Sequence, residues 1–287
     1  MGTLYVVGTP IGNLEDLSAR ALRMLREVSL VAAEDTRKTR TLFSRYDIHT
    51  PLTSYFEHNK LAKLDAILDA LGRGDVALVS EAGMPGLSDP GYELIRAAIR
   101  AGIPVVPIPG PVAAITALVV SDLPTDSFVF LGFLPRKAAE RRRALQEVAA
   151  ERRTLVLYEA PHRLADCLAD IEAVLGDRPV AVARELTKLH EEVYRGTVAG
   201  ARRHFASEVR GEVTLVLGGA TGGPAAWDEE RVRRALGEAL GGGADRKEAI
   251  RRVAQASGWP RREVYRLAVQ DAGCKMQEAG VEEKKSD

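Results

Sequence analysis

Short apolar runs alternate with stretches of helical periodicity in the first part of the chain. Strand-length apolar runs occur at residues 4–8, 30–33, 76–80 and 104–108. Between them, hydrophobic residues recur at the spacing of a buried helix face at 17–28, 61–71 and 92–101. Strands that alternate with helices are joined by right-handed crossovers and form parallel sheets. The pattern therefore predicts an N-terminal α/β domain with a parallel sheet over residues 1–122.

The pattern changes after Ser121–Ser127, a short polar stretch that contains Pro124 and two aspartates. Strand-like runs then follow at 128–134, 154–158, 179–185, 192–197 and 212–217. The last three lie too close together for long intervening helices, which favours antiparallel pairing. We therefore expect a second α/β domain with a mixed sheet over residues 123–220, and a boundary within the polar stretch.

The C-terminal part reads as a separate helical unit. Gly218–Pro224 is rich in glycine and is typical of a flexible connection. Helical patterns follow at 228–240, 246–257 and 261–271, with Asp245 and Ser257 as candidate polar caps or turn residues. We expect a three-helix unit over residues 225–273 and a disordered charged tail over residues 274–287.

The charge of the chain is balanced, with Lys plus Arg and Asp plus Glu at 40 each. Net charge therefore does not indicate nucleic-acid binding, but basic residues cluster at 136–143 and again at 246–266. Such clusters contact phosphates locally on a neutral protein, or they form solvated helix faces, and the sequence leaves both interpretations open.

Cysteine, histidine and hydropathy patterns exclude several classes of protein. No apolar run approaches the roughly 20 residues that span a bilayer, and Leu4–Val7 is too short for a signal peptide. Cys167 and Cys274 form no redox or metal motif, and the five histidines have no ligand spacing. We expect a cytoplasmic protein with no bound metal.

Unusual loops follow each of the four strands expected in the first domain. They are Gly8–Asn13, Glu34–Arg37, Ser80–Gly91 and Pro109–Pro111. In parallel sheets, ligands bind beyond the carboxyl ends of the strands, where glycine and proline let the backbone approach closely. The first loop has neither the Walker A pattern nor G-x-G-x-x-G. A small, mostly uncharged ligand that backbone groups hold suits these loops better than a phosphate or dinucleotide.

Eight motifs carry a family resemblance. In order along residues 4–219 they are VVGTPIGNLEDLS, AAEDTR, ALVSEAGMPGLSDPG, VVPIPGPVAAITAL, FLGFLPRK, LYEAPHRL, ARELTKLHEE and GEVTLVLGG. The set resembles the tetrapyrrole-methylase superfamily, in the branch that 2′-O-methylates a cytidine in the decoding region of 16S rRNA. The C-terminal helical segment is similar to the extension of the same branch. The order and number of the motifs make the resemblance specific.

The resemblance implies a tetrapyrrole-methylase-like fold, with S-adenosyl-L-methionine in a cleft between two α/β domains. It also implies a homodimer that acts on 16S rRNA within the 30S subunit. Carried over by motif, the cofactor-binding residues are Pro10, Ser80, Ala82, Gly83, Leu87, Val112, Ala113 and Tyr158. The chain departs from the usual pattern at Glu81, where aspartate is commoner, and at Met84, where threonine is commoner.

Methyl transfer to a ribose hydroxyl requires that the hydroxyl proton leave, so a carboxylate or a neutral amine near the cleft is a candidate base. Glu34, Asp35, Glu185 and Lys188 stand at predicted strand ends. We rank Asp35 first and Lys188 second. The alternative for Asp35 is an ion pair with Arg37 that shapes the loop.

Further residues are candidates for RNA contacts. Arginine binds phosphates through planar, bidentate hydrogen bonds, and the candidates are Arg37, Arg136, Arg163 and Arg184. Tyr55 and Phe56 are candidates for stacking on a base, with core packing as the alternative. His58 and His162 lie within the family's motifs and fit a structural role.

Two other functions remain open. One is a tetrapyrrole C-methylase, although such enzymes typically have Gly-Gly-Asp-Pro where this chain has Ala82–Pro85, and they lack the basic helical extension. The other is a non-catalytic RNA-binding adaptor on the same scaffold. Cofactor binding, followed by methyl transfer to small subunits or to a porphyrinoid, separates the three.

Overall fold

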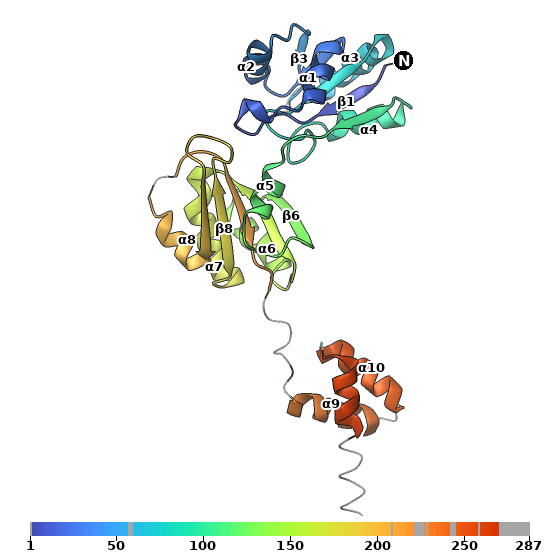
Figure 1. Ribbon diagram of the computed structural model, residues 1–287, viewed down its shortest axis with the longest axis vertical. Helices are drawn as coiled ribbons and strands as arrows, with labels where there is room; N and C mark the ends of the chain where they lie inside the picture. Colours follow the sequence, from blue (N-terminus) through green and yellow to red (C-terminus); the bar gives the residue numbers. More distant parts are fainter. Residues whose placement is uncertain are drawn as a thin grey trace, which may run out of the picture. The chain divides into compact units, whose positions relative to one another are not determined.

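The computed structural model describes residues 2–56, 60–207, 209–220, 227, 229–241, 245–257 and 259–269 (Figure 1). Residues Met1–Ala220 form one compact unit, and Thr221–Asp287 form another. The first unit holds both sheets and the second is helical. The predicted tail at 274–287 lies outside the described residues. In the described part of the chain, no helix is both long and apolar enough to cross a membrane.

The first sheet is parallel, as its sequence pattern predicts. Its order is β3-β2-β4-β1-β5, and each neighbouring pair is parallel. The strands are β1 (Leu4–Val7), β2 (Leu30–Ala33), β3 (Leu52–Ser54), β4 (Val76–Val79) and β5 (Val105–Ile108). The central strands are almost fully buried, as expected when helices cover both faces of a sheet.

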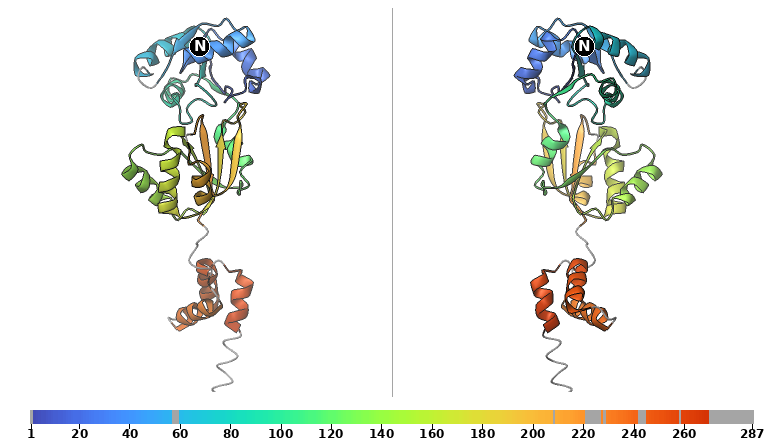
Figure 2. Two further views of the ribbon diagram at one scale, coloured as in Figure 1. Left: turned by 90° about the vertical axis from the view of Figure 1, so that its left-hand side faces the viewer. Right: turned by 90° about the vertical axis from the view of Figure 1, so that its right-hand side faces the viewer.

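Helices pack on both faces of this sheet (Figures 1 and 2). One face is covered by α1 (Ala19–Glu27) and α2 (Thr36–Tyr46), and the other by α3 (Lys60–Arg73) and α4 (Tyr92–Arg100). A short 3-10 turn, η1 (Leu14–Asp16), precedes α1. The hydroxyl of Ser18 accepts a hydrogen bond from the Ala21 N–H at 3.1 Å and so caps the N-terminus of α1.

The second sheet is mixed, with the order β6-β7-β10-β8-β9. Its strands are β6 (Phe128–Phe133), β7 (Thr154–Glu159), β8 (Pro179–Arg184), β9 (Glu192–Thr197) and β10 (Val213–Leu217). Strands β6 and β7 are parallel, whereas β10 runs antiparallel to β7 and β8, and β8 antiparallel to β9. The expected antiparallel pairing of the last three strands is confirmed.

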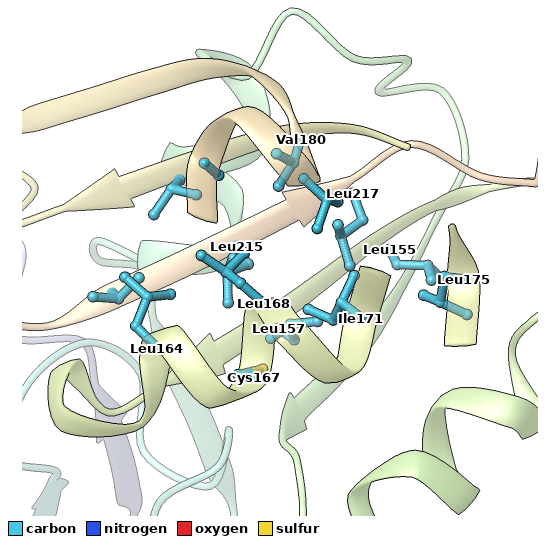
Figure 3. Packing of buried hydrophobic residues seen from close by; sticks show 14 of the residues in the cluster. Leu155, Leu157, Leu164, Cys167, Leu168, Ile171, Leu175, Val180, Leu215 and Leu217 are labelled. Carbon is cyan, nitrogen blue, oxygen red and sulfur yellow. The ribbon is translucent and has the colours of Figure 1, made fainter. Parts of the chain in front are cut away.

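Two apolar cores sandwich the second sheet. On one face, α6 (Ala138–Glu147), α7 (Leu164–Leu175) and α8 (Val198–His204) cover the strands, and the short turn η2 (Pro161–Arg163) precedes α7. Figure 3 shows Leu164, Leu168 and Ile171 of α7 packed against leucines of β7 and β10. On the other face, α5 (Ala113–Val119) packs through Ala117 and Leu118. Helix α5 comes before the expected boundary at Ser121–Ser127 and packs on the second sheet.

The helical unit has a core of its own. It comprises α9 (Glu229–Gly241), α10 (Arg246–Ser257) and a third helix over 261–269, which together bury residues such as Leu236, Val253 and Leu267. Asp245 accepts a hydrogen bond from the Glu248 N–H at 2.8 Å and so caps α10. The Ser257 hydroxyl accepts from the Trp259 N–H at 3.2 Å in the following turn, so both polar residues have the predicted kind of role.

Candidate active site

A cavity of about 260 Å³ lies where the carboxyl ends of the first sheet's strands meet the second sheet. Loops after β1, β2, β4 and β5 line one side, and the ends of β6, β7 and β8 with the start of β10 line the other. The lining residues are Ile11, Glu34, Glu81, Ala82, Gly83, Met84, Leu87, Asp89, Val112, Ala113, Phe133, Tyr158, Ala183, Leu186, Glu212, Val213 and Thr214. This is the edge at which ligands of parallel α/β sheets bind.

Close backbone packing shapes the floor of this cavity. Thr9 and Gly83 exchange two backbone hydrogen bonds of 2.9 and 3.0 Å, which join the first loop to the long loop. Gly83 has a φ of +79°, a conformation that glycine adopts without strain. A Cβ at Gly8 would lie 2.7 Å from the Gly110 Cα, so the end of β1 touches the Pro-Gly-Pro turn directly.

Tyr158 links the second sheet to the start of α5. Its hydroxyl accepts a hydrogen bond from the Ala114 N–H at 3.2 Å, and its ring lies edge-on to Phe130 with centroids 5.1 Å apart. Burial raises the pKa of the Tyr158 hydroxyl. The phenol therefore stays neutral near pH 7 and holds the end of β7 against the loop at Val112 and Ala113, which is part of the cavity wall.

The structure gathers the residues expected to bind the cofactor. Six of them line the cavity: Ala82, Gly83, Leu87, Val112, Ala113 and Tyr158. Pro10 and Ser80 line an adjoining cavity, also of about 260 Å³. Ser80 is buried, and its hydroxyl donates to the Ala82 carbonyl at 3.2 Å, so it shapes the loop from within.

Acidic residues line the cavity that the six residues form. They are Glu34, Glu81, Asp89 and Glu212, and no Lys or Arg is among the described lining residues. Burial, with the nearby charge of Glu34, raises the pKa of Asp89 to about 7. Burial also raises the pKa of Glu34, although its carboxylate accepts the Glu81 N–H at 3.0 Å. Sequence reasoning missed Asp89, Glu212 and Phe133: Asp89 and Glu212 stand inside quoted motifs, but nothing in the spacing separates them from other acidic residues.

The adjoining cavity contains two lysines. It shares Ile11, Glu81, Ala82 and Glu212 with the first cavity and adds Lys38 and Lys188 among others. The Lys38 ammonium pairs with Glu81. The Lys188 Nζ lies 2.8 Å from Glu185 Oε1 and 3.0 Å from Glu212 Oε2. The two cavities are therefore neighbours along a common wall, one acidic and one with two cations.

Ion pairing and burial determine which of the Lys188 and Glu185 side chains are charged. Burial alone would lower the pKa of Lys188, but hydrogen bonds from its ammonium to Glu185 and Glu212 raise it. The same contact with Lys188 lowers the pKa of Glu185. Lys188 is therefore a charged donor rather than a neutral base. Glu185 and Thr187 have φ values of +53° and +67°, so this turn holds a strained backbone, as functional turns often do.

Asp35 caps a helix and does not line either cavity. Its carboxylate accepts the Arg37 and Lys38 N–H groups at 2.8 and 3.3 Å and pairs with the Arg37 side chain at 3.2 Å. The contact with Arg37 lowers the pKa of Asp35. The structure therefore favours the loop-shaping alternative for Asp35 over the role of a base.

The candidate RNA-contacting arginines differ in exposure. Arg37, with 87% of its side chain exposed, and Arg136 are open to solvent. Arg163 is largely buried, pairs with Glu159 at 3.2 Å and donates to the Leu134 carbonyl at 2.9 Å. It holds the end of β6 from inside, so we leave it out of the RNA surface. Arg184 is partly exposed and paired with Glu192.

The aromatic and histidine candidates also differ in their burial and in their place in the fold. Tyr55 is fully buried in the core of the first domain, whereas 38% of Phe56 is exposed. His162 lies in η2, and His58 lies outside the described residues. Within the described part of the chain, no group of His, Cys, Asp or Glu is arranged to hold a metal ion.

Comparison with solved structures identifies the fold. A uroporphyrin-III-C-methyltransferase from Thermus thermophilus aligns with a TM-score of 0.54 at 24% identity, over 76% of this chain and 94% of that one. The methyltransferase CobJ aligns with a TM-score of 0.56 at 18% identity, over 77% and 95%. At these identities the likeness shows the fold alone. The chain thus has the fold of these tetrapyrrole methyltransferases, with a cavity at the strand ends.

Sequence comparison gives the family. Residues 3–201 match the family described as Tetrapyrrole (Corrin/Porphyrin) Methylases. Proteins named ribosomal RNA small subunit methyltransferase I are 48% identical in Halalkalibacterium halodurans, over 94% of this chain and 96% of that one, and 46% identical in Synechocystis, over 94% and 98%. The chain therefore belongs to the tetrapyrrole methylase family, in the branch of the ribosomal RNA small subunit methyltransferase I proteins. This membership confirms the expected family, fold class and S-adenosylmethionine as cofactor.

Proposed function

We propose that the chain transfers a methyl group from S-adenosylmethionine to the ribose 2′-hydroxyl of a cytidine in the decoding region of 16S rRNA. The substrate is the assembled 30S particle, and the enzyme acts as a homodimer in the cytoplasm. The names of its relatives support a ribosomal RNA substrate. The observation that carries the proposal is the acidic cavity at the strand ends, which adjoins a second cavity with two lysines.

The residues of the first cavity fit the cofactor. Its volume approaches that of sites for small ligands. Gly83, Val112 and Ala113 offer backbone groups, Tyr158 and Leu87 offer apolar surface, and the carboxylates suit a cation. When bound, S-adenosylmethionine supplies an electrophilic methyl group on a sulfonium centre. The task left for the chain is to position the acceptor and exclude water.

We assign the acceptor nucleotide to the second cavity. Lys188 lines it, and Glu185 and Glu212 hold its ammonium in place. A charged lysine so fixed donates a hydrogen bond to a ribose or phosphate oxygen and orients the 2′-hydroxyl. Because Ile11, Glu81, Ala82 and Glu212 line both cavities, the two spaces adjoin, and the hydroxyl would reach the methyl group where they meet. Fixing two reactants in this way contributes up to roughly 7–11 kcal/mol to lowering the barrier.

Basic side chains outside the cavities supply binding energy for RNA. Arg37 follows Asp35 at the start of α2, and Arg136 precedes α6. In the helical unit, Arg246, Lys247, Arg261 and Arg262 are exposed. Tyr265 lies between the arginines of the third helix and is 57% exposed. Arginine with an exposed aromatic ring suits RNA, since it combines phosphate contacts with base stacking.

A transfer assay with S-adenosylmethionine labelled in its methyl group tests the proposal. Full-length protein should label 30S subunits, and mass spectrometry of the digested RNA should find one 2′-O-methylcytidine. Free 16S rRNA should be labelled more slowly, and uroporphyrinogen III not at all. Labelling of the tetrapyrrole in preference to the subunit would favour the C-methylase. Binding of RNA without any transfer would favour the adaptor.

A further inference from the structure

Two of the carboxylates in the first cavity are in no ion pair with a described residue, although the charge of Lys38 acts on one of them, Glu34. Glu81 pairs with Lys38, and Glu212 pairs with Lys188. Glu34 and Asp89 form no ion pair within the described part of the chain, although both line the cavity. A buried carboxylate without a partner is costly, and the same cavity that buries these two is open to a ligand.

The fold holds both side chains in place. Glu34 directly follows β2, and its Oε2 accepts the Glu81 N–H at 3.0 Å. Asp89 lies in the long loop after β4 near the Ser80 hydroxyl, a contact that favours its ionised form. The preceding residue, Ser88, has a φ of +62°, so the loop is turned sharply at this point. Both carboxylates are therefore preorganised parts of the cavity wall.

We propose that Glu34 and Asp89 recognise the sulfonium charge of the methyl donor, so that the cavity binds S-adenosylmethionine more tightly than S-adenosylhomocysteine. The inference rests on the proposed function, because it places the cofactor in this cavity. In the transfer, the sulfur–methyl bond breaks, its electron pair stays on sulfur, and an oxygen–methyl bond forms as the hydroxyl proton leaves to solvent. The ligand thereby loses its sulfonium charge while its amino-acid part is unchanged.

The carboxylates thus interact with the sulfonium charge, which S-adenosylmethionine has and S-adenosylhomocysteine lacks. Carboxylates in the cavity wall that form no ion pair attract the cation but give a neutral thioether no comparable gain. Methyl transfer removes the sulfonium charge. The electrostatic attraction that favours binding of the donor is therefore absent when the product leaves. Positive charge in the second cavity does not cancel this effect, because its two lysines are already paired with Glu81, Glu185 and Glu212.

The same arrangement makes donor binding depend on pH. The groups that face Asp89 are Ser80, Glu34 and Glu81 from the first domain, with Glu212 and Tyr158 from the second. The pKa of Asp89 is about 7 in the free protein, mainly because the side chain is buried. A bound cation favours the ionised form, so binding releases a proton and the donor binds more tightly as pH rises from 6 to 8. The neutral product lacks this dependence.

Calorimetry on the full-length protein tests the inference without any methyl transfer. The ligands are S-adenosylmethionine, S-adenosylhomocysteine and sinefungin, which carries an amine where the donor carries its sulfonium. Asp89→Asn and Glu34→Gln should each reduce the preference for the donor over the product by about fivefold to tenfold. Sinefungin should follow the donor. Asp69→Asn, an exposed aspartate of α3, is the matched control and should leave the preference unchanged.

The pH series on the unaltered protein is a second measurement that needs no variant. The donor-to-product preference should rise between pH 6 and 8, and it should lose that rise in Asp89→Asn. Equal losses of donor and product affinity in both variants, or a pH-independent preference, would overturn the inference. A protein that binds neither ligand would instead refute the cofactor site of the proposed function. Normal binding of the donor without methyl transfer to 30S subunits would refute only the proposed RNA acceptor.

Discussion

A half-buried carboxyl group without an ion-pair partner makes the stability of a protein depend on pH, and Asp89 is such a group among the described residues. Its pKa is raised to about 7, chiefly by burial, whereas an aspartate in the unfolded chain has its ordinary pKa of 3.8. Between these two values the folded state binds more protons than the unfolded state. The contribution of Asp89 to stability is therefore full below about pH 4 and is lost as pH rises through 7.

The upward shift of the Asp89 pKa gives a prediction for Asp89→Asn in the absence of cofactor. The variant removes the ionisation, so its free energy of unfolding at pH 8 should exceed that of the unaltered protein by about 1–2 kcal/mol. This free-energy difference is smaller than the one that the whole pKa shift would give, because the carboxyl group is partly open to solvent. Urea unfolding at pH 4 and pH 8 measures it. The difference between the two proteins should be smallest at pH 4 and grow up to pH 7, and a difference that does not change with pH would contradict the prediction.

A second prediction separates Asp35 from Lys188. Asp35 caps α2, and asparagine caps helices equally well, so Asp35→Asn should lower the single-turnover rate by less than about threefold. Lys188→Met removes the donor that orients the acceptor and should lower the rate by about 10²-fold or more. Both variants should bind S-adenosylmethionine normally. A large loss in Asp35→Asn with intact cofactor affinity would restore Asp35 as a base.

At the scale of elements, regular hydrophobic patterns were sufficient to predict most strands but only part of the helices, since α5, α6, α7 and α8 were not predicted. The first sheet has five strands where the pattern indicates four, and α2 and β3 were also not predicted. The reason lies in their residues. Helix α2 buries only Thr39, Leu42 and Phe43 among many charged residues, and β3 is a partly buried edge strand of three residues. Neither carries enough apolar periodicity to be recognised.

The candidate site was predictable in its loops and less so in its side chains. Glycine and proline mark where the backbone approaches a ligand, which is why Gly83, Val112 and Ala113 were found through their motifs. The role of a carboxylate depends on its burial and partners, which no spacing reveals. Asp35 and Asp89 are the same residue type, yet one caps a helix beside Arg37 and the other lies in the cavity without an ion pair.

The long loop after β4 can be tested through Gly83. Its φ of +79° disfavours a β-branched residue, and it exchanges backbone hydrogen bonds with Thr9 beside the cavity. Gly83→Val should therefore abolish measurable binding of S-adenosylmethionine while the circular dichroism spectrum stays that of a folded protein. Gly72→Val, in α3 with open space around it, is the control and should bind normally. Unchanged affinity in Gly83→Val would place the cofactor elsewhere.

At the scale of the whole molecule, the chain consists of two units that each bury their own core. The cavities lie entirely within Met1–Ala220, and the helical unit packs around residues such as Leu236 and Val253. Each unit therefore has the apolar burial that independent folding needs. This separation suggests a division of tasks, with chemistry in the first unit and docking of ribosomal RNA in the second.

Deletion of residues 225–287 tests this division. S-adenosylmethionine affinity should stay within about twofold, whereas 30S binding should weaken and depend less on salt. Each phosphate contact that is lost should reduce the slope of log K against log salt by roughly 0.7–0.9. Salt titration of subunit binding by both proteins is the measurement. An unchanged slope and affinity would instead give the helices a role in stability or dimerisation.

The adjoining cavities also specify what an inhibitor must look like. A compound that fills only the acidic cavity competes with a cofactor that many methyltransferases share, so selectivity has to come from its neighbour. Because Ile11, Ala82 and two glutamates line both spaces, a short linker is enough to join two fragments. The cavity with Glu34 and Asp89 accepts a basic fragment, whereas the second cavity, in which glutamates pair with both lysines, accepts a polar fragment without net charge. A bisubstrate compound for this enzyme is therefore a cation that carries its charge on the fragment in the first cavity.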